Sequence, residues 1–263
     1  MNLAGRTVLL TGATGGLGGA IARALVAKGA TLVLTGRRAD ALAAIAAETG
    51  GRPVPCDLAD PGAAEALARD AGDVDVLVAN AALPASGELT SFSVEEIDRA
   101  LMVNLRAPMV LARLLAERMI ARRSGHLVFV SSLSGKAASP GGSVYSATKF
   151  GLRGFSLALR EDLAPFDVGV SCVYPGFVRD AGMFADTDAA LPFFVQTSSS
   201  EQVADGVVHA VEANRAEVDI APLPMRAGAL AATVAPGLVA IVQRRLGGDA
   251  VSRALADAQR DKR

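Results

Sequence analysis

Short apolar runs and longer helix-like stretches alternate from one end of the chain to the other. Short runs of apolar and β-branched residues between glycine or polar positions are typical of buried strands. Such runs occupy residues 7–10, 31–35, 53–55, 74–79, 126–131 and 168–174, with a weaker one at 217–221. The stretches between them are long enough for helices, which we expect at residues 16–28, 39–48, 61–71, 94–122, 143–164 and 200–213.

This alternation predicts an α/β fold built on one doubly wound parallel sheet of about seven strands. Successive parallel strands need crossover connections, which are right-handed and place helices on both faces of the sheet. No linker, low-complexity block or repeat of solenoid length interrupts the pattern, and 263 residues suit one large domain. We therefore expect a single domain.

Distinctive residues follow the expected strands at their carboxyl ends. They are Gly12, Gly36, Asp57, Asn80, Ser132 and the pair Pro175 and Gly176, each after a different strand. In a parallel α/β sheet these ends meet at one edge, and ligands bind there where the strand order reverses. The sequence therefore predicts one ligand site assembled from loops that are far apart along the chain.

Composition narrows the possible functions. Hydrophobic residues make up 51% of the chain and charged residues 20%, which supports a substantial core and argues against global disorder. The formal net charge of -1 provides no long-range field that would attract nucleic acid. Cys56 and Cys172 lie in separate expected strands, as packing residues rather than a disulfide or metal pair, and His126 and His209 lack partners at ligand spacing. The N-terminus lacks the apolar core of a signal peptide, so we expect a cytoplasmic protein.

A glycine-rich loop joins the first expected strand to the first expected helix. Its glycines are Gly12, Gly16 and Gly18, in the spacing Gly-x-x-x-Gly-x-Gly. Glycines at such a junction allow a tight turn and a close approach of the backbone to a pyrophosphate, and the helix N-terminus offers amide donors to the phosphates. A flexible turn is the alternative, but the position between strand and helix favours a dinucleotide site.

Two arginines follow the second expected strand, where an acidic residue would bind a free ribose diol. Arg37 and Arg38 stand near a helix start, where the helix dipole disfavours cations. A 2′-phosphate would explain them, since guanidinium suits phosphate, so we favour NADP(H) over NAD(H). The alternative is a solvated basic turn. Asp57, after the third strand, is placed either to contact adenine or to cap the next helix.

Tyr145 and Lys149 are four residues apart in an expected helix, so their side chains share one face. An ammonium about 4 Å from a phenol favours the phenolate by up to about 4 kcal/mol, which would lower the tyrosine pKa by up to about three units. The Ser132 hydroxyl, delivered from a strand end, could hold a carbonyl or alcohol oxygen beside that phenol. The trio predicts proton transfer on oxygen, against the alternative of a chance helical pair and an ordinary strand-end hydroxyl.

These residues together resemble the classical short-chain dehydrogenases/reductases, over about residues 5–222. The resemblance is carried by Thr11-Gly12-x-x-x-Gly16-x-Gly18, Ala79-Asn80-Ala81-Ala82, Val103-Asn104-Leu105, Ser132, Tyr145, Lys149 and Pro175-Gly176-Phe177-Val178. Some positions depart from the family pattern. Ala79-Asn80-Ala81-Ala82 differs at two positions from the family's Asn-Asn-Ala-Gly segment. Asp180 replaces the usual threonine, and Gly15 stands where many NADP-dependent members have a basic residue.

The resemblance implies a Rossmann-type fold and an oxidoreductase that moves a hydride between the cofactor and a carbonyl or secondary alcohol. Tyr145 would be the general acid or base, Lys149 would lower its pKa and bind the nicotinamide ribose, and Ser132 would orient the substrate oxygen. Asn104 would hold a water in a proton relay through Lys149. The implied cofactor contacts are Gly12, Thr14, Gly16, Leu17, Gly18, Arg37, Arg38, Asp57, Leu58, Asn80, Ala81, Tyr145, Lys149, Pro175, Gly176 and Val178.

The resemblance also divides the chain into a catalytic domain at 1–222, with a substrate loop at about 180–200, and an extension at 223–263. In the loop, apolar side chains favour a hydrophobic substrate, or alternatively cap the core; they are Met183, Phe184, Leu191, Phe193 and Phe194. The uncharged stretch 227–242, followed by Arg244 and Arg245, is too short to span a bilayer comfortably. It is a packed helix, an oligomer contact or, through 227–245, a peripheral membrane element.

We expect a homodimer or homotetramer, since family members commonly assemble so and the helices at 107–122 and 143–164 are alanine-rich. Two other functions remain open: a nucleotide-binding regulator without turnover, and a dehydratase or epimerase on the same scaffold.

Overall fold

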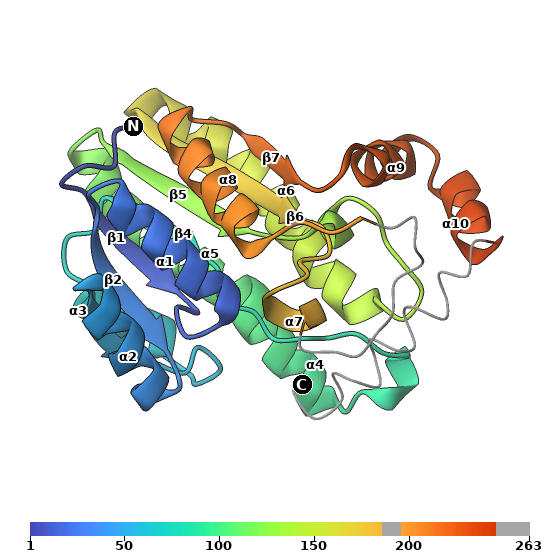
Figure 1. Ribbon diagram of the computed structural model, residues 1–263, viewed down its shortest axis with the longest axis horizontal. Helices are drawn as coiled ribbons and strands as arrows, with labels where there is room; N and C mark the ends of the chain where they lie inside the picture. Colours follow the sequence, from blue (N-terminus) through green and yellow to red (C-terminus); the bar gives the residue numbers. More distant parts are fainter. Residues whose placement is uncertain (186–195, 246–263) are drawn as a thin grey trace.

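A single sheet of seven parallel strands forms the centre of the protein in a computed structural model, which describes residues 1–185 and 196–245 (Figure 1). The strands are β1 (Thr7–Thr11), β2 (Thr31–Gly36), β3 (Arg52–Pro55), β4 (Val76–Ala79), β5 (Gly125–Val130), β6 (Val168–Pro175) and β7 (Glu217–Ile220). Their order is β3-β2-β1-β4-β5-β6-β7, and every neighbouring pair is parallel. The order reverses between β1 and β4, which confirms the doubly wound Rossmann-type sheet and puts the expected ligand edge beside the end of β1.

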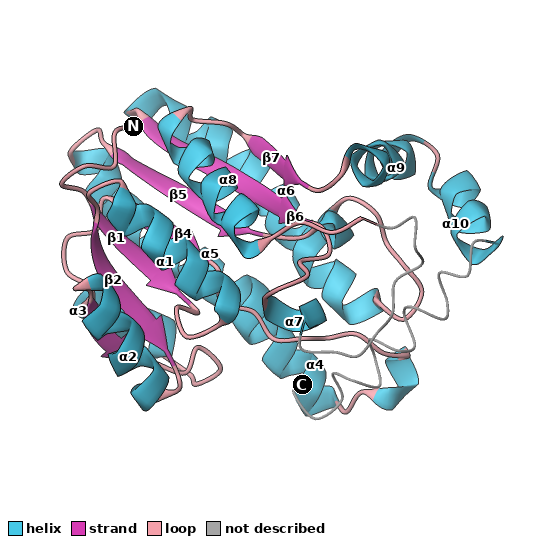
Figure 2. Cartoon of the chain, in the orientation of Figure 1, coloured by secondary structure: helices cyan, strands magenta, loops and turns pink. Residues whose placement is uncertain are grey.

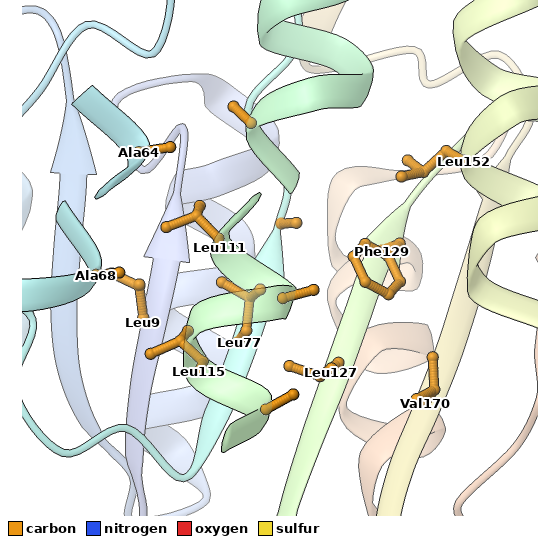
Figure 3. Close-up of a cluster of buried hydrophobic side chains, with 14 of the residues drawn as sticks. Leu9, Ala64, Ala68, Leu77, Leu111, Leu115, Leu127, Phe129, Leu152 and Val170 are labelled. Carbon is orange, nitrogen blue, oxygen red and sulfur yellow. The ribbon is translucent and has the colours of Figure 1, made fainter. Parts of the chain in front are cut away.

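Helices cover both faces of the sheet (Figure 2). One face carries α1 (Gly16–Ala27), α2 (Ala39–Thr49) and α8 (Ser200–Glu212), and the other carries α3 (Ala63–Asp70), α5 (Ala107–Ala121) and α6 (Ser143–Leu163). Because side chains alternate along a strand, β1 supplies both cores: Val8 and Leu10 pack on the α1 side, whereas Leu9 packs on the α5 side. Figure 3 shows the core on the α5 side of the sheet, in which Leu9 and Leu77 of the sheet pack against Leu111 and Leu115 of α5.

The outer strands of the sheet differ from the inner ones in composition. β5 and β6 are buried at every position, and their near-continuous apolar runs are those expected for strands covered on both faces. At one edge, β3 contains Pro53 and Pro55, which cannot donate to a strand ladder and are tolerated at an edge.

The helix expected at residues 94–122 is present as continuous helical backbone from Val94 to Ala121, but it contains one turn of π type that the sequence did not predict. Helix α4 (Val94–Leu101) begins at a capping box between Ser93 and Glu96, and a wide turn of π type, η2 (Met102–Arg106), separates it from α5. Within that turn the buried Asn104 side chain bonds the main chain of Leu83, across the end of β4. The apolar pattern continues through the turn, so periodicity alone does not reveal it.

The chain beyond β7 forms two further helices, α9 (Leu223–Val234) and α10 (Pro236–Arg245), which project from the sheet in Figure 1. Ala229 and Met225 of α9 pack against the same core as α5 and α6, so this part of the extension lies on the catalytic unit. In the described residues no helix is both long and apolar enough to cross a membrane. The remaining short elements are η1 (Leu89–Ser91), η3 (Leu133–Gly135), η4 (Ala164–Phe166) and α7 (Gly182–Ala185).

Candidate active site

The glycine loop at the end of β1 is a tight cradle that has no room for side chains. Gly12 has a φ of +69°, and a Cβ added there would lie 2.8 Å from the Cα of Ala81. A Cβ on Gly18 would overlap the carbonyl oxygen of Gly12, and one on Gly16 would lie 2.9 Å from the Cβ of Ala181. The loop therefore runs closely over the N-terminus of α1, and this Cβ-free surface fits the pyrophosphate of a dinucleotide.

Asn80 and Thr11 hold this loop in place. The Asn80 amide donates to the carbonyl oxygens of Thr11 at 3.0 Å and Gly12 at 3.3 Å. The Thr11 hydroxyl in turn accepts hydrogen bonds from the main-chain N–H groups of Asn80 and Ala81, each at 3.0 Å. The ends of β1 and β4 are thus tied together at the reversal of strand order. Thr11, which sequence reasoning quoted only as part of a motif, is as much a part of this support as Asn80.

A surface hollow of about 540 Å³ adjoins the ends of β2 and β3, and it is lined by Arg37, Arg38, Pro55, Cys56 and Asp57. Both arginines are exposed, and the Arg38 guanidinium donates to the carbonyl oxygen of Thr14 in the glycine loop. A hollow with these polar side chains beside the cradle fits the adenosine end of a dinucleotide.

Asp57 does not cap the next helix, since α3 begins at Ala63 with Gly62 as its N-cap. Instead its carboxylate accepts a hydrogen bond from the Ala59 N–H at 3.0 Å, which shapes the turn after β3. Leu58, named among the implied cofactor contacts, is buried in the core, and Leu17 packs partly buried on the α1 side of the sheet.

Ser132, Tyr145 and Lys149 are brought together by two elements that pack closely. Ser132 ends β5 and begins the turn η3, and its hydroxyl accepts from the Ser134 N–H at 3.1 Å. Tyr145 and Lys149 lie in the first two turns of α6. The turn touches the helix so tightly that a Cβ on Gly135 would lie 2.7 Å from the carbonyl oxygen of Lys149. This contact places the serine hydroxyl beside the tyrosine.

Lys149 is buried behind the tyrosine. Its Nζ donates to the carbonyl oxygen of Val130 at 3.0 Å and lies 5.5 Å from the centre of the Tyr145 ring. Burial lowers the pKa of the Lys149 ammonium to about 8, because the charge has lost its water. At neutral pH the group is still mostly protonated.

Tyr145 is half-buried and packs against the cluster of Ala85, Ala100 and Val144. Burial raises the pKa of the phenol to about 12, although a hydrogen bond with Ser132 acts in the opposite direction. The expectation that Lys149 acidifies this phenol is therefore wrong for the protein by itself. The loss of water around a phenolate outweighs the hydrogen bond with Ser132, and the Lys149 ammonium donates to the Val130 carbonyl oxygen.

Asn104 lies in the wide turn between α4 and α5 and is 1% exposed. Its Oδ1 accepts from the Leu83 N–H at 2.7 Å, and its Nδ2 donates to the Leu83 carbonyl oxygen at 2.9 Å. Each polar atom of the side chain therefore already has a protein partner. The observed task of this side chain is to fix the segment after β4.

The segment after β6 approaches the same edge. Pro175 ends the strand, the Gly176 N–H donates to the Ile220 carbonyl oxygen at 2.9 Å, and Val178 forms a parallel bridge with Ser198. Sequence reasoning missed the role of Asp180. Its carboxylate accepts from both the N–H and the hydroxyl of Ser200, at 2.9 and 3.1 Å, which ties the loop to the start of α8.

The hydrogen bonds from Ser200 hold the pKa of the Asp180 carboxyl below its usual range, against the opposing effect of burial. Of the expected substrate-loop side chains, Met183 and Phe184 lie on α7. The Phe184 ring packs against the Phe177 ring, and the two ring centres are 5.1 Å apart. Leu191, Phe193 and Phe194 lie outside the described residues.

Comparison with known proteins agrees with this arrangement. Residues 6–192 match the sequence profile of the family described as short chain dehydrogenase. The chain is 39% identical over 233 residues to ketoacyl reductase HetN of Nostoc sp., over 85% of this chain and 81% of that protein. A short-chain dehydrogenase from Sphingobium yanoikuyae in complex with NADPH superposes with a TM-score of 0.74 at 28% identity, over 81% of this chain and 87% of the other.

A short-chain dehydrogenase from Streptomyces avermitilis has a TM-score of 0.77 at 26% identity and covers more of the protein, 94% of this chain and 98% of its own. The family profile spans the glycine loop, the serine turn (Ser132 to Gly135) and the first turns of α6, so the likeness includes the candidate site as well as strands β1 to β6. Members of this family bind NAD(P) and act on carbonyl or alcohol groups. The chain therefore belongs to the short-chain dehydrogenase/reductase family and is an oxidoreductase.

Proposed function

We propose that this enzyme transfers a hydride between NADP(H) and an apolar carbonyl/secondary alcohol pair, with Tyr145 as the general acid or base. The observation that carries the proposal is the meeting of the Ser132 and Tyr145 hydroxyls, with Lys149 buried behind them, at the sheet edge that also holds the glycine cradle. A bound dinucleotide supplies or accepts the hydride there.

The side chains divide the remaining work. The Ser132 hydroxyl orients the substrate oxygen beside the phenol. In reduction Tyr145 donates its proton to that oxygen, and its pKa of about 12 in the protein alone keeps the phenol protonated and ready. The Lys149 ammonium then stabilises the phenolate that remains. In oxidation the same groups act in reverse order, with the phenolate as base.

The preference for NADP(H) rests on the two arginines in the hollow after β2 and β3. Guanidinium groups pair well with phosphate, and the Sphingobium relative was solved with NADPH. Gly15 supplies no cation, so Arg37 and Arg38 would carry the preference between them.

The double substitution of Arg37 and Arg38 by alanine tests this preference. Because a 2′-phosphate is absent from NADH, we expect NADPH affinity to fall roughly tenfold to a hundredfold and NADH affinity to change little. Fluorescence titration of both nucleotides measures the two constants. Equal losses for NADPH and NADH would remove the phosphate assignment.

The substrate class rests on apolar side chains near the site and on a relative. Phe177 and Phe184 pack together where the chain leaves β6, and HetN is named a ketoacyl reductase. A screen of aliphatic ketones, ketoesters, aldehydes and alcohols with NADPH and NADH tests the proposal. The gain or loss of the reduced cofactor is measured by its absorbance at about 340 nm. Net NADPH consumption would exclude both a silent regulator and a dehydratase or epimerase that returns its cofactor unchanged.

Family members often form oligomers, and we propose that this chain does so through α5 and α6. Met109 on α5 and Phe150 and Leu157 on α6 are 37%, 40% and 36% exposed, which leaves an apolar outer face on these helices.

We also propose that α9 contacts an anionic lipid surface. Leu223, Leu230 and Val234 are 74%, 68% and 81% exposed and share the helix side opposite the packed Ala229. Between Asp219 and Asp249 the sequence contains three arginines and no acidic residue, a balance that suits anionic headgroups.

A further inference from the structure

A group of charged side chains lies directly behind the serine turn. None of them is among the side chains that we propose to contact the substrate. Lys136 follows η3, four residues after Ser132, and its side chain is only 10% exposed. Its Nζ lies 2.6 Å from Oδ1 of Asp219 and 3.6 Å from Oε2 of Glu217. The same ammonium stands 4.0 Å from the centre of the buried Tyr174 ring. Lys136 is therefore held on several sides.

Glu217 also reaches the helix that carries the tyrosine and lysine. Its Oε1 accepts from Nε of Arg153 at 2.8 Å, and Arg153 lies one turn after Lys149 on α6. One carboxylate on the edge strand β7 thus bridges the end of the serine turn and the side of α6. Glu217 and Asp219 are two residues apart in a strand, so both face these cations, while Val218 and Ile220 pack on the opposite side of the sheet.

The serine turn is short and stiff enough to transmit this anchor. The Gly135 N–H donates to the Ser132 carbonyl oxygen at 2.8 Å, and the Lys136 N–H donates to the Leu133 carbonyl oxygen at 2.9 Å. A displacement of Lys136 would therefore move the turn as one piece. Loss of its charge would also leave two carboxylates close together without their shared cation, which favours separation of the turn from β7.

We propose that Lys136 is a positioning residue that holds the Ser132 hydroxyl against Tyr145 by anchoring the serine turn to Glu217 and Asp219. The inference rests on the proposed function, because Ser132 matters to catalysis only if the hydroxyl orients substrate. Lys136, Glu217 and Asp219 are not among the implied cofactor contacts, so this inference concerns the serine hydroxyl and not the binding of the nucleotide.

The first test compares Lys136→Met with Lys136→Arg. We expect the methionine variant to lose kcat about tenfold to a hundredfold on the best substrate of the screen, while its Kd for NADPH stays within about twofold of wild type. Lys136→Arg, which keeps the charge, should regain most of the loss. Arg113→Met is the matched control, because it removes an exposed ion pair with Glu117 on α5. Unchanged kcat in Lys136→Met, or no recovery with arginine, would overturn the proposal.

The second test does not need turnover. The chain contains two tyrosines and no tryptophan, so ¹³Cζ-tyrosine labelling gives one resonance each for Tyr145 and Tyr174. We expect Lys136→Met to move the Tyr145 resonance in the same direction as Ser132→Ala, because both remove the serine hydroxyl from the phenol. A Tyr145 resonance that stays at its wild-type position in Lys136→Met would also overturn the proposal.

The two tests separate failure of this inference from failure of the proposed function. A wild-type enzyme that reduces no carbonyl contradicts the function, whereas the resonance of Tyr145 still decides the role of Lys136. Should Lys136→Met not fold by circular dichroism, Asp219→Asn weakens the same anchor and is read by the same two measurements.

Discussion

Tyr145 and Lys149 show how a spacing that is plain in the sequence can have an energetic consequence that is not. Four residues on a helix placed the two side chains on one face, as predicted. The pKa of Tyr145 shifts the other way from the prediction, because burial disfavours the phenolate, and burial also lowers the pKa of Lys149. The spacing of two residues in the sequence predicts that their charges attract each other. How far each charged group loses its hydration depends on its burial, which the whole fold determines.

Replacing Tyr145 with phenylalanine removes the proposed proton donor and little else. We expect kcat to fall at least about a hundredfold, because general acid catalysis is lost, and the Kd for NADPH to stay within about twofold. Steady-state kinetics and fluorescence titration measure the two quantities. Turnover that survives the substitution would rule out Tyr145 as the acid.

The rate of reduction should depend on the charge of Lys149. Its folded pKa is lowered to about 8, so the ammonium is present below that pH and is lost above it. We therefore expect kcat to be level up to about pH 7 and to fall, by up to about tenfold per unit, as pH rises through about 8. A pH–rate profile checks this, and a rate that rises through the same range would contradict the role of the ammonium.

At the scale of elements, hydrophobic periodicity predicted all seven strands and most helices, but it missed features that depend on contacts far along the chain. The wide turn between α4 and α5 is set by Asn104 and the main chain of Leu83, 21 residues apart. Asp180 meets Ser200 across 20 residues, and Lys136 meets Asp219 across 83. None of these pairs leaves a local pattern, because each partner is an ordinary polar residue in its own segment.

His126 at the start of β5 gives this strand a dependence on pH. The ring is 2% exposed, its Nε2 lies 2.8 Å from the Ser171 hydroxyl, and burial lowers its pKa to about 3. The unfolded chain binds the proton near pH 6.5, so the folded state loses stability as pH falls below that value. The loss amounts to up to about 5 kcal/mol by pH 3.

Urea unfolding at a series of pH values tests this dependence. His126→Asn, which does not titrate, should show a smaller decrease in the free energy of unfolding between about pH 6.5 and 4 than wild type. The difference between the two proteins isolates the histidine from the carboxylates that titrate at lower pH. Parallel curves would show that the pKa of His126 is the same in the folded and the unfolded chain, and would contradict this prediction.

At the scale of the whole molecule, the extension after β7 joins the catalytic unit and also exposes apolar side chains. We expect the protein to sediment with vesicles of phosphatidylglycerol more than with phosphatidylcholine, and Leu230→Gln with Val234→Gln to abolish this. Leu89→Gln, at a position that is 58% exposed elsewhere on the surface, is the matched control. Light scattering gives the mass of the same variants in solution. If the wild-type protein bound no vesicles and the double variant formed a smaller assembly, this face would be a subunit contact instead.

The strands at the two borders of the sheet also limit how copies of this protein can associate. Pro53 and Pro55 remove donors from β3, so another chain cannot readily continue the sheet beyond that border. At the far border, β7 is short and carries Glu217 and Asp219, and charged side chains on an edge strand discourage pairing with another strand. Polymerisation by strand addition is thus disfavoured at both ends, which leaves assembly to the helical surfaces and guards the folded enzyme against fibril growth.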